Sequence, residues 1–198
     1  MTELGSVFAK LLEVLDRFEI PYLVGGSVAS GSYGLPRQTN DIDIVADFAT
    51  ANLAEFFHLL KEDFYVDGET AMEAIRQGRP FNAIHLKGAF KFDFFPASAG
   101  GFSQSELRRR RYTVSAMPGL TNIEFAISSP EDTILAKMVW FRKGGETSDR
   151  QWHDILGVLR VQMATLDQDY LSHWAAQLNV TDLLHKATKD NREIKSGE

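Results

Sequence analysis

The chain has 198 residues, of which 44% are hydrophobic and 24% are charged, a composition typical of a globular protein with a core of its own. Its formal net charge of −6 excludes a general attraction for nucleic acid, so any contact with a polynucleotide has to come from a local basic patch. There is no cysteine, which excludes disulfides, thiolate zinc sites and cysteine nucleophiles. Without a signal-peptide pattern or an apolar run of the roughly 20 residues that span a bilayer, we expect a soluble cytoplasmic protein.

Periodicity in the first 128 residues predicts alternating helices and strands. Apolar residues at helical spacing predict an amphipathic helix over residues 3–18, and the apolar run Tyr22–Val24 predicts a buried strand that ends in a glycine turn. A segment of small residues predicts a short helix over residues 27–34. Strict alternation then predicts a strand over residues 41–45, and apolar residues at helical spacing predict a helix over residues 53–60.

The next segment predicts a short helix followed by a hairpin. Thr70 and Glu73 form a capping-box pattern, so we expect a helix to begin there and to stop at Gly78. Two strands are predicted over residues 81–86 and 89–95, joined by a tight turn.

The character of the chain changes at Ser129. Ser129 is a good N-cap, Pro130 suits the first helical position, and Asp132 completes a capping-box pattern. From there the predicted elements are helices over residues 130–142, 149–162, 168–178 and 181–188. The expected domains are a core domain over residues 1–128, a helical domain over residues 129–189 and a flexible tail over residues 190–198.

Asp41 and Asp43 are the first candidates for chemistry. Residues i and i+2 of a strand point the same way, so the two carboxylates are expected about 6.6 Å apart, with Ile42 and Ile44 buried behind them. Like charges placed in this way repel, and nothing in the local sequence neutralises them. A divalent cation such as Mg²⁺ resolves the conflict, because it binds carboxylates and takes phosphate oxygens as further ligands. The Asp-x-Asp pattern is weak by itself, and a solvated strand face is the alternative.

Residues that precede the acidic pair in the sequence are suited to phosphate. Gly25 and Gly26 let a backbone approach a phosphate closely, and Ser27 offers a hydroxyl and an N–H at a helix start, although a tight turn is the alternative. Arg37 and Thr39 come shortly before the acidic pair and are placed to contact phosphate oxygens.

Asp93 is the third acidic candidate. It lies between Phe92 and Phe94 in a predicted strand, on the face that also carries Lys91 and Phe95. An unpaired buried charge is costly, and a metal shared with the Asp-x-Asp pair would supply the partner. Further short strand-like runs follow over residues 112–128.

These motifs together resemble the nucleotidyltransferase superfamily that shares the DNA polymerase β core. The resemblance rests on Gly25-Gly26-Ser27, then thirteen residues, then Asp41-Ile42-Asp43-Ile44, and on Asp93 in a later strand. The second half is similar to the AbiEii-type toxin nucleotidyltransferases and their uncharacterised relatives, at Ser129-Pro130-Glu131-Asp132, Lys137, Arg150 and Trp152-His153-Asp154-Ile155. The implied fold is α+β (α/β), with a mixed polymerase β-like sheet flanked by helices and followed by a C-terminal helical bundle.

The resemblance also implies a reaction. A Mg-dependent nucleotidyltransferase transfers a nucleoside monophosphate from an NTP to an acceptor hydroxyl and releases pyrophosphate. Asp41, Asp43 and Asp93 would be both the catalytic residues and the ligands of two Mg²⁺ ions, with Mn²⁺ as an alternative metal. Asp93 would also accept the proton of the acceptor.

Two residues of the helical half complete the candidate site. Lys137 lies among apolar residues, where a snorkelling lysine is the alternative, but the resemblance favours contact with the triphosphate. Asp154 corresponds to a late acidic residue of the toxin-like relatives, although a surface or capping role is the alternative. The expected nucleotide-binding residues are Gly25, Gly26, Ser27, Arg37, Thr39, Lys137 and Asp154.

The acceptor stays open at this point. Arg108 to Arg111 form a basic run that could grip a polynucleotide backbone, although such runs are usually solvated faces. An RNA or tRNA acceptor and an antitoxin protein as partner follow from the toxin analogy. The alternatives are an adenylyltransferase for an aminoglycoside-like small molecule and a non-catalytic nucleotide-binding or interaction module.

Overall fold

The computed structural model describes residues 2–39 and 41–196, and this part of the chain divides into two compact units. The first unit combines Met1–Val28 with Gln38–Ser128, and the second combines Ala29–Arg37 with Ser129–Glu198. The change of character at Ser129 therefore coincides with a unit boundary. The second unit also includes a segment close to the N-terminus, which the sequence analysis had assigned to the core domain.

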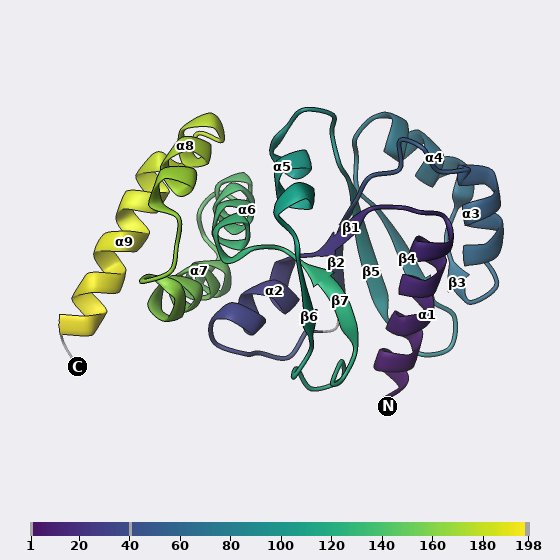
Figure 1. Cartoon of the computed structure of the whole chain (residues 1–198), viewed down its shortest axis with the longest axis horizontal. Coiled ribbons are helices and arrows are strands. Elements are labelled where there is room, and N and C mark those ends of the chain that lie inside the picture. Colours follow the sequence, from purple (N-terminus) through teal and green to yellow (C-terminus); the bar gives the residue numbers. More distant parts are fainter. Residues whose placement is uncertain (1, 40, 197–198) are drawn as a thin grey trace. The chain divides into compact units, whose positions relative to one another are not determined.

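The first unit is built on a mixed seven-stranded sheet (Figure 1). In spatial order, its strands are β3 (Phe64–Tyr65), β4 (Phe81–His85), β5 (Lys91–Pro96), β2 (Asp41–Ala46), β1 (Tyr22–Val24), β7 (Glu124–Ile127) and β6 (Arg111–Val114). The β2–β5 and β1–β7 pairs are parallel, and the other neighbours are antiparallel. The sheet therefore places β2 and β5 side by side although about fifty residues separate them in the chain.

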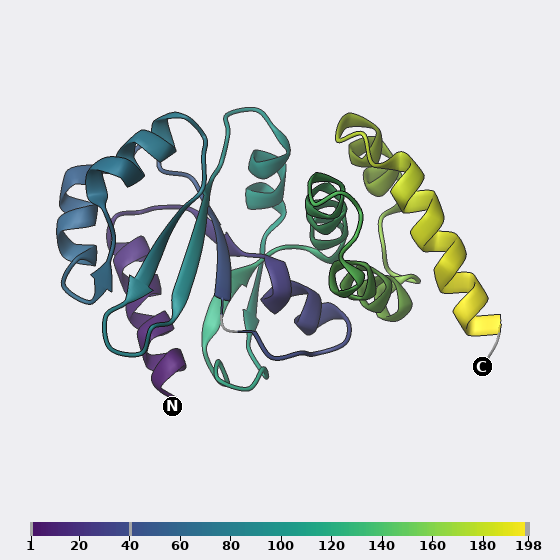
Figure 2. The ribbon, with the colours of Figure 1, turned by 180° about the vertical axis from the view of Figure 1, so that it is seen from behind.

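One face of this sheet carries the core of the unit. Helix α1 (Glu3–Arg17) begins at Thr2, whose hydroxyl accepts a hydrogen bond from the Gly5 N–H. Its buried Phe8 stacks on Phe92 of β5 and meets the edge of Phe125 of β7. The same face is covered by α3 (Leu53–Leu60), which contacts α1 and also packs against α4 (Gly68–Arg76) (Figures 1 and 2). Period-two alternation sends the other residues of β2 and β5 to the opposite face.

The second unit is helical. It contains α6 (Pro130–Lys143), α7 (Asp149–Gln162), α8 (Gln168–Gln177) and α9 (Thr181–Ser196), and the later part of α2 (Gly26–Tyr33) belongs to it. Ser129 caps α6 by accepting a hydrogen bond from the Asp132 N–H, as the sequence predicts. The buried Asp132 carboxylate is satisfied by hydrogen bonds from the Ser129 hydroxyl (2.8 Å) and the Tyr170 hydroxyl (2.6 Å).

Two glycines let the chain after α2 lie against α7 inside this unit. A Cβ on Gly34 would come within 2.7 Å of the backbone C of Gly157 and the N of Val158. A Cβ on Gly157 would come 3.4 Å from the Leu35 backbone N. The Gln162 amide donates to the Tyr33 carbonyl at 3.0 Å and closes the same contact. Only residues without a side chain allow two backbones to approach this closely.

The structure corrects three details of the sequence-based elements. Helix α4 begins at Gly68 and is capped by Asp67, whose carboxylate accepts from the Thr70 N–H, so Thr70 lies inside the helix. Helix α5 (Phe102–Arg109) was not predicted. Helix α9 continues to Ser196, well beyond residue 188, where the sequence predicted a flexible tail. None of the helices in residues 2–39 and 41–196 combines the length and apolar character that a membrane span requires.

Candidate active site

Strand register places the three predicted catalytic aspartates in adjacent positions. Asp43 of β2 lies directly beside Asp93 of β5, and Asp41 precedes Asp43 by two residues on the same strand. In β2 and β5 the intervening residues are buried, so the three side chains lie on the face opposite α1. The Asp93 side chain is 21% exposed and that of Asp41 is 54% exposed. We call these three residues the acidic triad.

The glycine turn meets the acidic triad at Asp43. Gly26 begins α2 with a φ of +54°, and a Cβ built on it would lie 1.7 Å from Oδ2 of Asp43. The Gly25 N–H donates to the Asp43 carbonyl at 2.9 Å, which continues the pairing of β1 with β2. Two features therefore require glycine at position 26: the left-handed backbone, which a residue with a side chain rarely adopts, and the Asp43 carboxylate, which leaves no space for a Cβ. The start of a helix also favours a nearby negative charge.

Lys91 occupies the space between two members of the acidic triad. It lies directly beside Asp41 in the register and two residues before Asp93 on the same strand face. Its Nζ is 2.8 Å from Oδ2 of Asp93 and 3.9 Å from Oδ2 of Asp41. The hydrogen bond to Asp93 raises the pKa of Lys91 above its usual value. Partial burial lowers this pKa, but the charges of Asp41 and Asp43 also raise it.

Two further residues shape the surroundings of the acidic triad. The Thr39 hydroxyl donates to the Asp41 carbonyl at 3.0 Å and accepts from the Asp41 N–H at 3.4 Å, so it fixes the entry of the chain into β2. Asn82 of β4 lies directly beside Asp93 in the antiparallel β4–β5 pair, and its side chain is exposed. The sequence analysis did not single out Asn82, because only the register across the hairpin places it there.

The remaining predicted charged residues form a second group, which lies in the helical unit. The Arg37 guanidinium donates to both carboxylate oxygens of Asp154, Nε to Oδ1 at 3.1 Å and Nη2 to Oδ2 at 3.2 Å. Lys137 Nζ donates to the same Oδ2 at 2.8 Å. Asp154 and Lys137 are almost fully buried, with side chains 7% and 9% exposed. We call Arg37, Lys137 and Asp154 the Asp154 cluster.

The electrostatics of the Asp154 cluster follow from its composition. Burial by itself would raise the pKa of the Asp154 carboxyl, but the hydrogen bonds from Arg37 and Lys137, with their charges, hold it below its usual value. Two cations therefore share one buried carboxylate. The sequence left a surface role and a capping role open for Asp154. Its side chain is buried, and Ser148 is the residue that caps α7, so neither role applies.

The acidic triad has the donor chemistry of a divalent-cation site. Three carboxylates on one sheet face suit Mg²⁺ or Mn²⁺, which prefer oxygen ligands. Within residues 2–39 and 41–196, however, no three acidic, histidine or cysteine side chains are gathered closely enough to hold an ion as they stand. Lys91 supplies positive charge at the triad in this structure. The residues fit a metal in their chemistry, and a bound ion has to share Asp93 and Asp41 with that ammonium.

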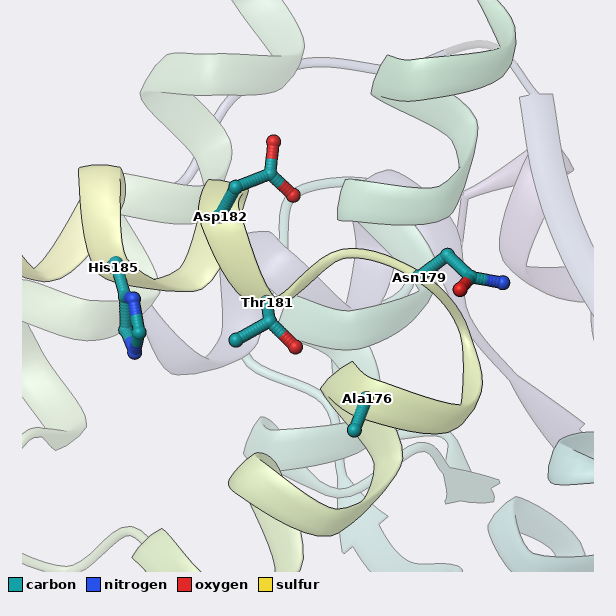
Figure 3. Close-up of a pocket in the computed structure, with 5 residues that line it drawn as sticks. All are labelled: Ala176, Asn179, Thr181, Asp182 and His185. Atoms are coloured by element: carbon teal, nitrogen blue, oxygen red, sulfur yellow. The ribbon is translucent and has the colours of Figure 1, made fainter.

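A surface hollow lies elsewhere, over the turn between α8 and α9 (Figure 3). Its lining residues are Ala176, Asn179, Thr181, Asp182 and His185. Asp182 supplies its acidic group, and Arg142 of α6 binds this carboxylate at 2.5 Å and also donates to the Asn179 carbonyl. That contact holds the pKa of Asp182 below its usual value. With its carboxylate already paired, the hollow is a weaker candidate for chemistry than the acidic triad.

Comparisons with known proteins address the fold. No family model and no curated protein matches the chain. An antigenic nucleotidyltransferase-like protein from Paracoccidioides brasiliensis matches with 18% identity and a TM-score of 0.50, over 94% of this chain and 92% of that one. The antibiotic-resistance factor ANT(2'')-Ia matches with 14% identity and a TM-score of 0.49, over 98% of this chain and 96% of that one. The lincosamide antibiotic adenylyltransferase LnuA, bound to lincomycin, matches with 14% identity and a TM-score of 0.49, over 76% of this chain and 93% of that one.

The predicted fold is confirmed. A mixed sheet flanked by helices and a set of C-terminal helices match the nucleotidyltransferase-like protein along most of both chains. The likeness to the nucleotidyltransferase-like protein concerns the fold. The narrower resemblance to the AbiEii-type toxins stays a prediction.

Proposed function

We propose that this protein is a metal-dependent nucleotidyltransferase, which transfers a nucleoside monophosphate from an NTP to an acceptor hydroxyl and releases pyrophosphate. The observation that carries the proposal is the register of Asp43 beside Asp93, with Gly26 packed against the Asp43 carboxylate. A purely structural sheet gains nothing from three carboxylates on one face, because each repels the others. A site that binds cations and phosphates needs all of them.

In this proposal the acidic triad holds two Mg²⁺ ions, with Mn²⁺ as a substitute. Bound there, the metal supplies Lewis-acid stabilisation of the phosphate charge that develops during transfer. Asp93 accepts the proton of the acceptor hydroxyl as its oxygen bonds to the α-phosphorus, and the bond from that phosphorus to pyrophosphate breaks. The turn at Gly26 and Ser27, at the start of α2, holds phosphate oxygens, while the Gly25 N–H stays bonded to the Asp43 carbonyl and Thr39 keeps Asp41 in place.

The Asp154 cluster supplies positive charge for the nucleotide in the same proposal. Lys137 and Arg37 bind phosphate oxygens, and Asp154 acts through them by fixing the directions of both side chains. A bidentate Arg–carboxylate pair also limits the freedom of the guanidinium, which lowers the entropy lost when a ligand binds.

For the acceptor we propose a polynucleotide, RNA or tRNA, with an antitoxin protein as the expected partner of such a toxin-like enzyme. The supporting observation is the edge strand β6, where Arg111 and Tyr112 are exposed next to the exposed Arg108 at the end of α5. Arginines and an exposed aromatic ring suit phosphates and an unstacked base. The alternatives remain an aminoglycoside-like small molecule and binding without turnover.

The test is transfer of label. The protein is incubated with each α-³²P-labelled NTP and Mg²⁺, together with total RNA, purified tRNA or a panel of aminoglycosides, and the products are separated by gel and thin-layer chromatography. We expect labelled RNA from one NTP, no product after chelation of the metal, and none with the D41N/D43N variant. Labelled aminoglycoside with unlabelled RNA would replace the acceptor by a small molecule. No labelled product, with NTP binding intact, would favour the non-catalytic module.

A further inference from the structure

Lys91 is the feature of the acidic triad that the proposed reaction leaves without a role. The triad carries three negative charges, and the Lys91 ammonium stands 2.8 Å from one carboxylate oxygen and 3.9 Å from another. These two carboxylates belong to neighbouring strands, β5 and β2, so Lys91 links them across the sheet. The alternation of β5 places its side chain on the triad face and away from the aromatic core.

The surroundings direct the ammonium toward the acids. On its other side Lys91 lies beside Ile84 of β4, which offers no acceptor. Its side chain is 37% exposed, so water reaches the group, and a solvated position was available to a flexible lysine. The close contact therefore reflects attraction between the Lys91 ammonium and the Asp93 carboxylate, and not a side chain that has no other place to go.

This contact has a consequence for metal binding. A divalent cation that binds Asp93 and Asp41 has to displace the Lys91 ammonium or bind beside it, and the two positive charges repel each other. Without the lysine, the same two carboxylates would attract the cation more strongly.

We propose that Lys91 is a built-in counter-ion of the acidic triad, a positioning residue that competes with divalent metal for Asp93 and Asp41 and so lowers the affinity of the nucleotide-free site for that metal. The inference rests on the proposed function, because it treats the triad as a cation site. It adds that this chain supplies the triad with positive charge of its own before any ion arrives.

The test measures metal binding in the absence of nucleotide. Mn²⁺ affinity and stoichiometry are measured by electron paramagnetic resonance and calorimetry on wild type, K91M, K91R and K87M. Lys87 is an exposed lysine in the turn before the same strand, so K87M removes an equal charge without touching the triad contacts. A unit charge about 5 Å from a divalent ion in water-like screening changes its binding roughly ten-fold.

We expect K91M to bind Mn²⁺ roughly ten-fold more tightly than wild type, while K91R and K87M stay within about two-fold of it. Thermal unfolding provides a second readout: K91M should melt below wild type without metal and gain more from added Mn²⁺. Equal Mn²⁺ affinity of K91M and wild type, or weaker binding by K91M, would overturn the counter-ion role. If wild type binds no Mn²⁺, the proposed metal-dependent function fails, and the inference fails with it.

Discussion

Gly26 offers the sharpest test of how the glycine turn and the acidic triad depend on each other. In Gly26→Ala the new Cβ has no space, because it would lie 1.7 Å from Oδ2 and 2.5 Å from Cγ of Asp43. The left-handed backbone by itself costs an alanine about 1–2 kcal/mol. The displaced carboxylate also leaves the start of α2, which costs roughly a further 0.3–1 kcal/mol. We therefore expect a loss of roughly 2 kcal/mol in the free energy of unfolding.

The neighbouring glycine is the matched control. A Cβ on Gly25 would lie 4.0 Å from Cδ1 of Leu23, an ordinary contact, so Gly25→Ala should leave the stability within about 0.5 kcal/mol of wild type. Urea denaturation and thermal melts measure both variants, and a loss of 2 kcal/mol corresponds to roughly 4–8 °C in a chain of this size. Mn²⁺ binding should weaken in Gly26→Ala because Asp43 has moved. The reasoning is refuted if the two variants are equally stable.

The other predictions concern charged groups. Asp154→Asn removes the buried carboxylate charge that Arg37 and Lys137 share and should destabilise the protein by about 3 kcal/mol at pH 7, measured by urea denaturation. The pKa of Asp154 is lower in the folded protein than the unfolded value of about 3.9, so its contribution to stability is present above that value and is lost as the pH falls through the folded pKa. The difference in unfolding free energy between wild type and Asp154→Asn should therefore narrow below about pH 4. A difference that stays constant with pH contradicts the pairing. Lys137→Ala should weaken NTP binding roughly 10- to 150-fold by calorimetry, and equal affinity removes it from the proposed site. R108A/R111A should weaken binding of single-stranded RNA and lower the slope of log affinity against log salt by about 1.4 in a filter assay, whereas an unchanged slope excludes this patch as an RNA contact.

Sequence periodicity was sufficient for the parts of the fold that are locally encoded. The alternation at Asp41 to Val45 and around Asp93 predicted which face each carboxylate occupies, and Ser129 marked the start of α6. A conflict between two local signals explains the misplaced start of α4. Asp67 precedes Thr70 by three residues as Thr70 precedes Glu73, and the earlier acceptor captured the Thr70 N–H.

Other features depend on contacts that no local pattern reveals. Lys91 is recognisable as a partner of Asp41 only once β2 and β5 are known to pair in parallel with this register. Helix α5 has few apolar residues, and its packing on β1 and β2 supports it where its own sequence does not. The last turns of α9 are polar, but Asn191 is buried and Asp190 accepts a hydrogen bond from the Trp152 indole at 3.1 Å.

The interleaving of the two units along the chain affects how the protein can be made. The segment Ala29–Arg37 leaves the ribosome early, but its partners are synthesised much later. Asp154, which binds Arg37, follows it by 117 residues, and Gln162, which binds Tyr33, follows it by 129 residues. During synthesis, this stretch is therefore exposed until the C-terminal helices emerge. A fragment that begins at Ser129 would lack the backbone that fills the space beside Gly157. Completion of the helical unit is thus a late step of folding, and both of its chain segments have to be present for it.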